Sequence, residues 1–135
     1  MLCLDTNSVI GIMSGRSATA IRRLREQVTR GTRILIPAIV VYELRFGAAR
    51  SARRVSNDQA VDSFLTPFET PSFDTDDAAE AADIRAHLHR GGTPIGPYDI
   101  LIAGQARRRG ATLVTSNTRE FRRVPRLSVE DWARP

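Results

Sequence analysis

Short apolar runs alternate with longer amphipathic segments along this 135-residue chain. Apolar runs of a few residues are typical of buried strands, whereas apolar positions that recur every three or four residues predict helices. Strands are predicted over residues 2–4, 33–36, 112–115 and 127–129. Helices are predicted over residues 6–13, 17–30, 37–49, 58–64, 74–89, 97–109 and 118–121. Two prolines interrupt residues 66–71, which favours a short edge strand over a helix there.

This alternation is typical of an α/β fold with a central, mostly parallel β-sheet that is flanked by helices. The length fits one domain over residues 1–135, because a chain of this size can bury most of the surface that it exposes when unfolded. In parallel sheets, ligands bind beyond the carboxyl ends of the strands. The chemistry of this chain is therefore expected where its strands end and the following helices begin.

The charge along the chain is strongly patterned. The net charge is +5, and all 20 basic side chains are arginine. Residues 1–54 carry 10 arginines and 3 acids, residues 55–99 carry 2 arginines and 9 acids, and residues 100–135 carry 8 arginines and 3 acids. The planar guanidinium group suits phosphate, which indicates a polyanionic partner such as nucleic acid. An arginine-rich composition with a solvated surface explains the same count, so charge alone leaves both interpretations open.

Composition disfavours several classes of protein. Without lysine, the chain lacks the group that P-loop proteins, receiver domains and haloacid-dehalogenase-type phosphatases place beside a phosphoryl group. The single cysteine, Cys3, cannot pair within the chain, which fits a reducing compartment. No apolar run approaches the ~18 residues of a membrane span, and the chain begins with a predicted strand rather than a signal peptide. We therefore expect a cytoplasmic protein without a membrane partner.

Residues 1–54 contain two acids that are candidates for a functional role. Asp5 is the first residue after the first predicted strand, where it can ligate a metal ion or cap the following helix. Glu43 shares a helix face with Val40 and Leu44, and Arg45 lies roughly opposite. An ionised carboxylate on an apolar face requires a metal ion or an ion pair with a buried arginine, and both remain open.

Three further polar residues occupy comparable positions. Asp99 is the third residue of the helix over residues 97–109, where the helix dipole and the free amides stabilise an acid without any functional role. Asn117 follows the third predicted strand, and Glu120 three residues later would complete a capping box. The functional alternative places Asn117 and Glu120 at the same edge of the sheet as Asp5.

Together, these positions gather three or four carboxylates at one edge of the sheet. Carboxylates that lie close together repel and raise each other's pKa values, and a divalent cation relieves that repulsion. Ligands that offer only oxygen indicate Mg²⁺ or Mn²⁺ rather than Zn²⁺. His87 and His89 are two residues apart and therefore face different sides of their helix, so they form no ligand pair.

Four motifs resemble those of PIN-domain ribonucleases, and more narrowly those of the VapC toxins of bacterial and archaeal type II toxin–antitoxin modules. The motifs are Leu4-Asp5-Thr6-Asn7, Pro37-x5-Glu43-Leu44-x2-Gly47, Gly96-x2-Asp99-x2-Ile102-Ala103 and Leu113-Val114-Thr115-x-Asn117-x2-Glu120-Phe121. The ending, residues 124–132, also resembles the VapC C-terminus. The resemblance is ordered and spans nearly the whole chain, although residues 50–90 carry no motif.

The resemblance implies a single PIN-like domain and a Mg²⁺-dependent endoribonuclease. Asp5, Glu43 and Asp99 match the three core acids of the family, and Asp5 and Asp99 are the expected metal ligands. The fourth position departs from the family, because many PIN domains carry aspartate in a loop where this chain has Asn117 and then Glu120. Glu120 is expected among the catalytic acids, and direct and water-mediated metal binding both remain open for it.

Polar side chains around the acids are expected to orient the metal ligands or the phosphate. They are Thr6, Asn7, Thr115 and Asn117. The arginines are expected to follow the phosphates of the nucleic acid. The run at residues 107–109 equally suits the C-terminus of its helix, so its role stays open.

The resemblance also implies partners. It implies cleavage of an RNA, such as tRNA or ribosomal RNA, that inhibits translation or growth, and neutralisation by a cognate VapB antitoxin. It further implies a homodimer, with higher-order assembly when the antitoxin binds. The antitoxin is expected in a groove between the helices over residues 6–30 and 37–49. The altered fourth position supports an alternative, a PIN-like protein that binds RNA or a partner without cleaving, and a DNA-directed nuclease of the same fold is a second alternative.

Overall fold

The computed structural model describes residues 1–134 and contains a four-stranded sheet. The strands are β1 (Leu2–Leu4), β2 (Ile34–Leu35), β3 (Thr112–Val114) and β4 (Val129–Glu130). Their order is β2-β1-β3-β4, and every neighbouring pair is parallel. In the register, Leu2 lies opposite Ile34 on one side and Thr112 on the other. The carboxyl ends of the strands therefore meet at one edge, as the sequence pattern predicts.

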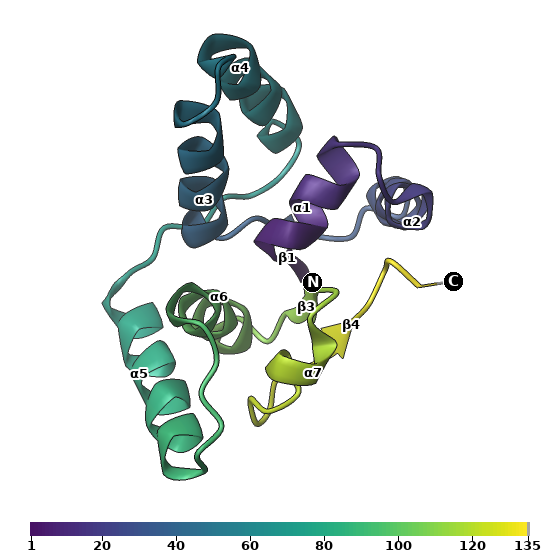
Figure 1. Ribbon diagram of the computed structural model, residues 1–135. Helices are drawn as coiled ribbons and strands as arrows, with labels where there is room; N and C mark the ends of the chain where they lie inside the picture. The colour runs from purple at the N-terminus through teal and green to yellow at the C-terminus, as the bar shows by residue number, and fades with distance from the viewer. Residues whose placement is uncertain (135) are drawn as a thin grey trace.

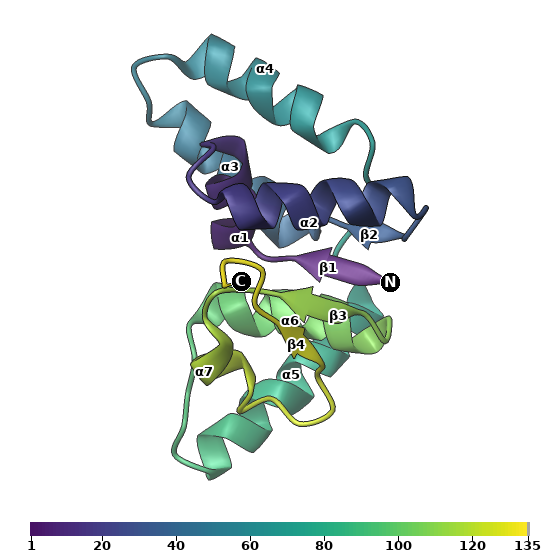
Figure 2. The same ribbon diagram turned by 90° about the vertical axis from the view of Figure 1, so that its right-hand side faces the viewer.

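Helices connect the strands and cover both sides of the sheet. They are α1 (Thr6–Met13), α2 (Ala18–Thr29), α3 (Ala38–Ala49), α4 (Arg54–Leu65), α5 (Thr75–Arg90), α6 (Pro97–Arg108) and α7 (Thr118–Phe121). Figure 1 shows α5 and α6 on one side of the strands and α2 on the other. In the view of Figure 2, β2, β1, β3 and β4 follow one another from top to bottom. The predicted α/β fold with a parallel sheet is confirmed.

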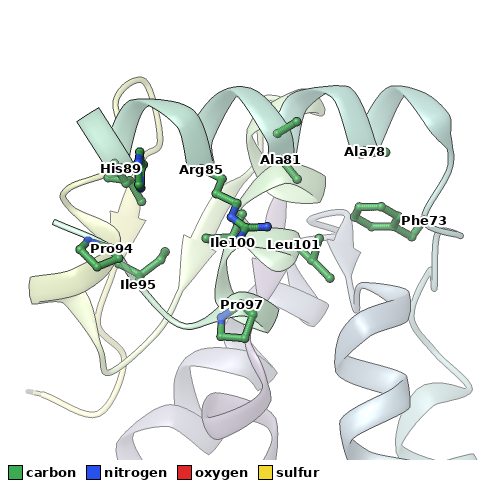
Figure 3. Close-up of a pocket in the computed structure, with 12 residues that line it drawn as sticks. Phe73, Ala78, Ala81, Arg85, His89, Pro94, Ile95, Pro97, Ile100 and Leu101 are labelled. Carbon is green, nitrogen blue, oxygen red and sulfur yellow. The ribbon is translucent and has the colours of Figure 1, made fainter. Parts of the chain in front are cut away.

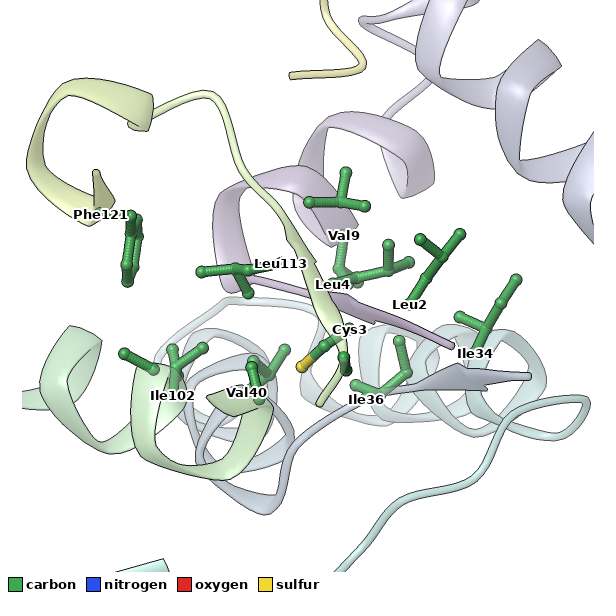
Figure 4. Packing of buried hydrophobic residues seen from close by; sticks show 14 of the residues in the cluster. Leu2, Cys3, Leu4, Val9, Ile34, Ile36, Val40, Ile102, Leu113 and Phe121 are labelled. Atoms are coloured by element: carbon green, nitrogen blue, oxygen red, sulfur yellow. The ribbon is translucent and has the colours of Figure 1, made fainter. Parts of the chain in front are cut away.

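The central strand β1 is buried on both faces. Figure 4 shows Leu2 and Leu4 directed toward Val9 of α1, whereas Cys3 is directed toward Val40 of α3 and Ile102 of α6. Side chains alternate between the faces of a strand, so helices on both sides allow an uninterrupted apolar run. Burial also raises the pKa of the Cys3 thiol. The first residue after this run, Asp5, is thereby brought to the edge of the sheet.

Close packing of α5 against α6 fixes the position of the helix that carries Asp99. Gly104 of α6 lies so close to Ala81 of α5 that a β-carbon at residue 104 would be 2.9 Å from the β-carbon of Ala81. The two helices also form ion pairs, which are described below. Because the C-terminal half of α6 is held against α5, packing determines the direction in which the first turn of α6 points.

Three predicted elements differ clearly from the structure, and the first is the last strand, which covers Val129–Glu130 instead of residues 127–129. The helix predicted over residues 58–64 begins four residues earlier, at Arg54. Asp58 therefore lies inside the helix, where its carboxylate forms an ion pair of 3.4 Å with Arg45 of α3. Residues 66–71 form no strand, and Glu69 makes a single parallel bridge with Leu35. Within residues 1–134, no helix has both the length and the hydropathy required to span a membrane.

Candidate active site

Asp5 lies at the carboxyl end of β1, directly before α1. One of its carboxylate oxygens accepts a hydrogen bond of 2.9 Å from the backbone N–H of Ser8, so Asp5 caps α1. The side chain is buried, and this burial raises the pKa of Asp5. Interactions with the Thr115 side chain and with Ser8 lower the pKa, and the charge of Asp131 raises it further. The capping role is confirmed, and it uses only one of the two carboxylate oxygens.

Asp99 projects from the first turn of α6, whose N-cap is Gly96. A β-carbon at residue 96 would lie only 3.3 Å from a carboxylate oxygen of Asp99, so the absence of a side chain there leaves room for the carboxylate. The pKa of Asp99 is raised to about 6. Burial is the main cause, and the charges of Asp5, Glu43 and Glu120 add to it. The structure thus brings the four predicted acids into one electrostatic environment.

Glu43 lies in the middle of α3, and its charge acts on Asp99. Its carboxylate accepts a hydrogen bond of 2.7 Å from the hydroxyl of Thr6, the first residue of α1. The alternative of an ion pair with a buried arginine is wrong, because Glu43 forms no ion pair with any of the residues 1–134. Thr6 therefore orients the Glu43 carboxylate, and this contact joins α1 to α3 beside Asp5.

Glu120 reaches the same edge from the short helix α7. Its carboxylate accepts a hydrogen bond of 2.8 Å from the side-chain amide of Asn117. The backbone N–H of Asn117 donates to the hydroxyl of the buried Thr115 at 2.9 Å. The predicted capping box is wrong: Asn117 occupies the N-cap position but makes no side-chain capping bond, because its amide is directed to Glu120. Asn117 thus positions Glu120, and Thr115 supports both Asn117 and Asp5.

A fifth acid, Asp131, belongs to this region and is missing from the residues predicted from the sequence. It directly follows β4, and its charge contributes to the raised pKa of Asp5. The rule that picked out Asp5, an acid directly after a strand, points to Glu130 when it is applied to the strand predicted over residues 127–129. Asp131 holds that position because β4 ends at Glu130. Asp131 also lines a cleft of about 130 Å³, together with Asn7, Ser116 and the exposed Arg16. Asn7 is thus placed beside the acids, in this cleft.

The acidic side chains of the site can be tested as ligands for the Mg²⁺ or Mn²⁺ expected from the sequence. Among residues 1–134, no three acidic, histidine or cysteine side chains lie close enough together to coordinate one ion as they stand. Glu43 and Glu120 are instead held by Thr6 and Asn117. The acids nevertheless offer oxygen alone, and repulsion among them adds to burial in raising the pKa of Asp99. A divalent cation with a preference for oxygen would relieve that repulsion, so the residues present fit Mg²⁺ or Mn²⁺.

The arginine run at residues 107–109 does not face the acids of the site. Each of the three arginines binds acids of α5: Arg107 is paired with Glu80 at 2.6 Å and with Asp83 at 2.7 Å. Arg108 is paired with Asp74, Asp76 and Asp77, and Arg109 is paired with Asp77 at 2.7 Å. The run lies at the C-terminus of α6, as one predicted role implies, and Arg109 donates a hydrogen bond of 2.9 Å to the carbonyl of Gln105 there. The run joins α6 to α5.

The two helices α5 and α6 also border an apolar pocket of about 500 Å³ (Figure 3). Arg85 extends over it, and Ile95, Ile100 and Leu101 lie on its inner side. None of the candidate acids lines this pocket. The polar chemistry of the molecule is therefore found at the edge of the sheet rather than in its apolar pocket.

Comparison with known sequences identifies relatives over nearly the whole chain. The family described as PIN domain matches residues 2–127. A "tRNA(fMet)-specific endonuclease VapC" of Salmonella typhimurium is 40% identical over 130 residues, which cover 96% of each chain. A "Ribonuclease VapC2" of Rickettsia felis is 33% identical over 129 residues, again 96% of each chain. The match extends through all four motifs that carry the candidate acids.

Comparison with solved structures gives the same relatives. VapBC2 of Rickettsia felis, bound to a DNA fragment from its promoter, superposes with a TM-score of 0.90 at 31% identity, covering 97% of this chain and 98% of the other. DNA-bound VapBC of Salmonella typhimurium superposes with a TM-score of 0.89 at 39% identity, covering 98% and 99%. The arrangement of strands and helices is thus shared over almost the entire length.

Proposed function

The chain belongs to the PIN-domain family, and from this premise we propose that it is a metal-dependent endoribonuclease of the VapC type. Its role is that of the toxin in a type II toxin–antitoxin module, where RNA cleavage inhibits translation or growth. The observation that carries the proposal is the shared environment of Asp5, Glu43, Asp99 and Glu120, which acts on the pKa of Asp99. Relatives named as ribonucleases support the same activity.

In this mechanism, Asp5 and Asp99 would hold Mg²⁺, and Glu43 would complete the site directly or through water. The ion supplies charge neutralisation for the phosphodiester and activation of a water molecule. Glu43, oriented by Thr6, accepts a proton from the attacking water, and Glu120, held by Asn117, is the second candidate for this step. In-line attack on phosphorus breaks the bond to the 3′-oxygen, which leaves a 5′-phosphate and a 3′-hydroxyl.

Exposed arginines near the acids provide the phosphate contacts. Arg119 and Arg122 flank Glu120 on and just after α7, and both are exposed. Arg16 is exposed beside the cleft that contains Asp131. In contrast, Arg108 already forms ion pairs with three acids at the N-terminus of α5. These differences support RNA binding at the surface around α7 and α1.

A salt titration tests this assignment. If Arg122 contacts one phosphate, Arg122→Gln should reduce the slope of log affinity against log salt by about 0.7 to 0.9. Arg108→Gln is the matched control on α6 and should leave the slope unchanged. An unchanged slope for Arg122→Gln would contradict the proposed contact.

The partners follow from the relatives whose structures are VapBC complexes. We propose that a cognate VapB antitoxin binds between α1–α2 and α3 and neutralises the enzyme in the cytoplasm. A homodimer is the proposed form of the toxin, with higher-order assembly in the complex. Purification together with the antitoxin encoded beside it, followed by measurement of the mass in solution, tests both parts.

The first RNA to test is tRNA(fMet), because the 40% identical relative is named for it. Purified protein should cleave this RNA in Mg²⁺, EDTA should stop the cleavage, and Asp99→Asn should abolish it. Mapping of 5′ ends in cells after induced expression identifies the natural target. RNA binding without cleavage in Mg²⁺ or Mn²⁺ would contradict the proposal and would identify a binding protein of the same fold.

A further inference from the structure

Two exposed tyrosines stand directly beside the candidate catalytic acids. Tyr42 immediately precedes Glu43 on α3, and Tyr98 immediately precedes Asp99 on α6. Their ring centroids are 5.5 Å apart with an angle of 55° between the planes, and their hydroxyl oxygens are 3.5 Å apart. We refer to them as the tyrosine pair. The pair bridges the two helices that carry Glu43 and Asp99.

The fold does not account for this exposure. Tyr42 is 50% exposed and Tyr98 is 45% exposed, although aromatic side chains of this size ordinarily contribute large buried areas to a core. The neighbouring positions on the same helices, Leu44 and Ile100, are buried and fulfil the packing role. The two rings therefore touch each other across α3 and α6 while leaving much of their surface available to a ligand.

This inference rests on the proposed ribonuclease function and names the part of the RNA that is held. We propose that the tyrosine pair stacks against a nucleobase next to the phosphodiester that faces Glu43 and Asp99. Aromatic rings bind the bases of single-stranded nucleic acid by stacking, and this contact tolerates different bases because every base has a π-face. The tyrosine hydroxyls add hydrogen-bonding groups that suit the polar edges of a base.

The position of the pair favours a nucleobase over other occupants. Each tyrosine is the helical neighbour of a residue that carries a candidate catalytic acid, and the contact between the two rings joins α3 to α6 at the level of Glu43 and Asp99. A base stacked there would fix the adjacent phosphate relative to the acids, which is what cleavage between defined nucleotides requires. Phe46, one turn along α3, is also exposed, but its ring faces Arg50 at 5.4 Å rather than α6. Phe46 is therefore a matched control.

The test measures stacking directly. Single-stranded RNA carrying the fluorescent base 2-aminopurine at each position in turn is bound to the full-length protein in EDTA, so that no cleavage interferes. Stacking on an aromatic ring quenches this fluorescence, which a purely structural role of the tyrosines would not do. Wild-type protein should quench one position strongly, and that position should adjoin the bond that is cut when Mg²⁺ is added.

Variants assign the quenching to the pair. Tyr42→Leu/Tyr98→Leu should lose the quenching and weaken RNA binding on the order of 10-fold, as expected for the loss of a stacked base. Tyr42→Phe/Tyr98→Phe keeps both rings and should retain the quenching. Phe46→Leu should bind and quench like wild type. Circular dichroism of the leucine variant should match wild type, because neither ring belongs to the core.

Several results would overturn the inference. Quenching that survives in the leucine variant would exclude the pair as the stacking surface, and equal losses in Phe46→Leu would show that the pair has no special role. A leucine variant with normal RNA binding but a changed mass in solution would identify the pair as a contact between two copies of the chain. Quenching by the pair without cleavage in Mg²⁺ would instead support the stacking surface while contradicting the proposed ribonuclease.

Discussion

Replacement of Asp99 by asparagine is expected to make the folded protein more stable at neutral pH while it abolishes cleavage. The Asp99 carboxylate is partly buried, and the charges of Asp5, Glu43 and Glu120 act on it. Ionisation of Asp99 therefore disfavours the folded state. Asparagine keeps the shape of the side chain and its place in the first turn of α6 but removes the charge. The repulsion among the remaining acids is reduced accordingly.

The magnitude follows from the pKa of Asp99. A rise from the ordinary value of 3.8 to about 6 corresponds to roughly 3 kcal/mol of unfavourable free energy on ionisation. The side chain is partly exposed and solvent screens the neighbouring charges, so we expect about 1–2 kcal/mol to be measurable.

The sign depends on pH. Below pH 3.8 the carboxyl is protonated in both states and the effect is absent. As the pH rises to about 6, the unfolded chain releases its proton first, so the wild type loses stability relative to the variant.

Urea unfolding in EDTA at several pH values measures the difference. The variant should be more stable than wild type at pH 7.5, and the two should converge near pH 4. Added Mg²⁺ should stabilise the wild type more than the variant, because binding to the folded state raises its stability and the variant lacks one proposed ligand. Asp83→Asn is a suitable control, since Asp83 is paired with Arg107 and its removal should not stabilise the protein. A less stable Asp99→Asn protein at pH 7.5, or a gain that persists unchanged at pH 4, would refute the reasoning.

Three further outcomes are expected. Asp77→Asn should lower the free energy of unfolding by about 3 kcal/mol in urea titrations at pH 7, because it removes one partner of a buried ion pair. Since ion pairing lowers the pKa of Asp77 despite its burial, this loss should shrink as the pH falls below the ordinary range for aspartate. Gly104→Ala should destabilise by roughly 1–3 kcal/mol through its contact with Ala81, and Ala81→Gly in the same chain should restore part of the stability. Thr6→Val should lower the cleavage rate roughly 10-fold with little change in the melting temperature, because Glu43 loses its orienting hydrogen bond.

Local sequence patterns were sufficient to predict the sheet and most of the helices. An apolar run such as Leu2–Leu4, buried on both faces, has few alternatives to a central parallel strand. The start of α4 was predicted four residues late, and the ion pair between Asp58 of α4 and Arg45 of α3 is a tertiary contact that the local pattern does not show. The bridge at Glu69 similarly depends on where β2 lies in space rather than on residues 66–71 themselves.

For the site, too, positions that depend on local sequence could be predicted, and contacts between distant segments were missed. Asp5 and Asp99 could be placed because one follows a strand and the other begins a helix at the same edge. The pairing of the arginines at residues 107–109 was missed, although a signal was present. The connection over residues 91–96 is short, and short connections make neighbouring helices antiparallel. That geometry places the acids at the start of α5 beside the arginines at the end of α6.

Helix α6 has charged groups at both ends. The arginines at its C-terminus are attracted to acids of α5, whereas Asp99 at its N-terminus is repelled by other acids, and the attraction at one end explains why the repulsion at the other persists. At its C-terminal end, Arg107, Arg108 and Arg109 bind the acids of α5, and Gly104 packs closely against that helix. At its N-terminal end, Asp99 lies among acids that repel it. Because a helix moves as a rigid unit, the contacts at one end prevent Asp99 from retreating at the other. The attraction at the C-terminal end of α6 thus holds Asp99 near Asp5, Glu43 and Glu120 despite the repulsion among their charges.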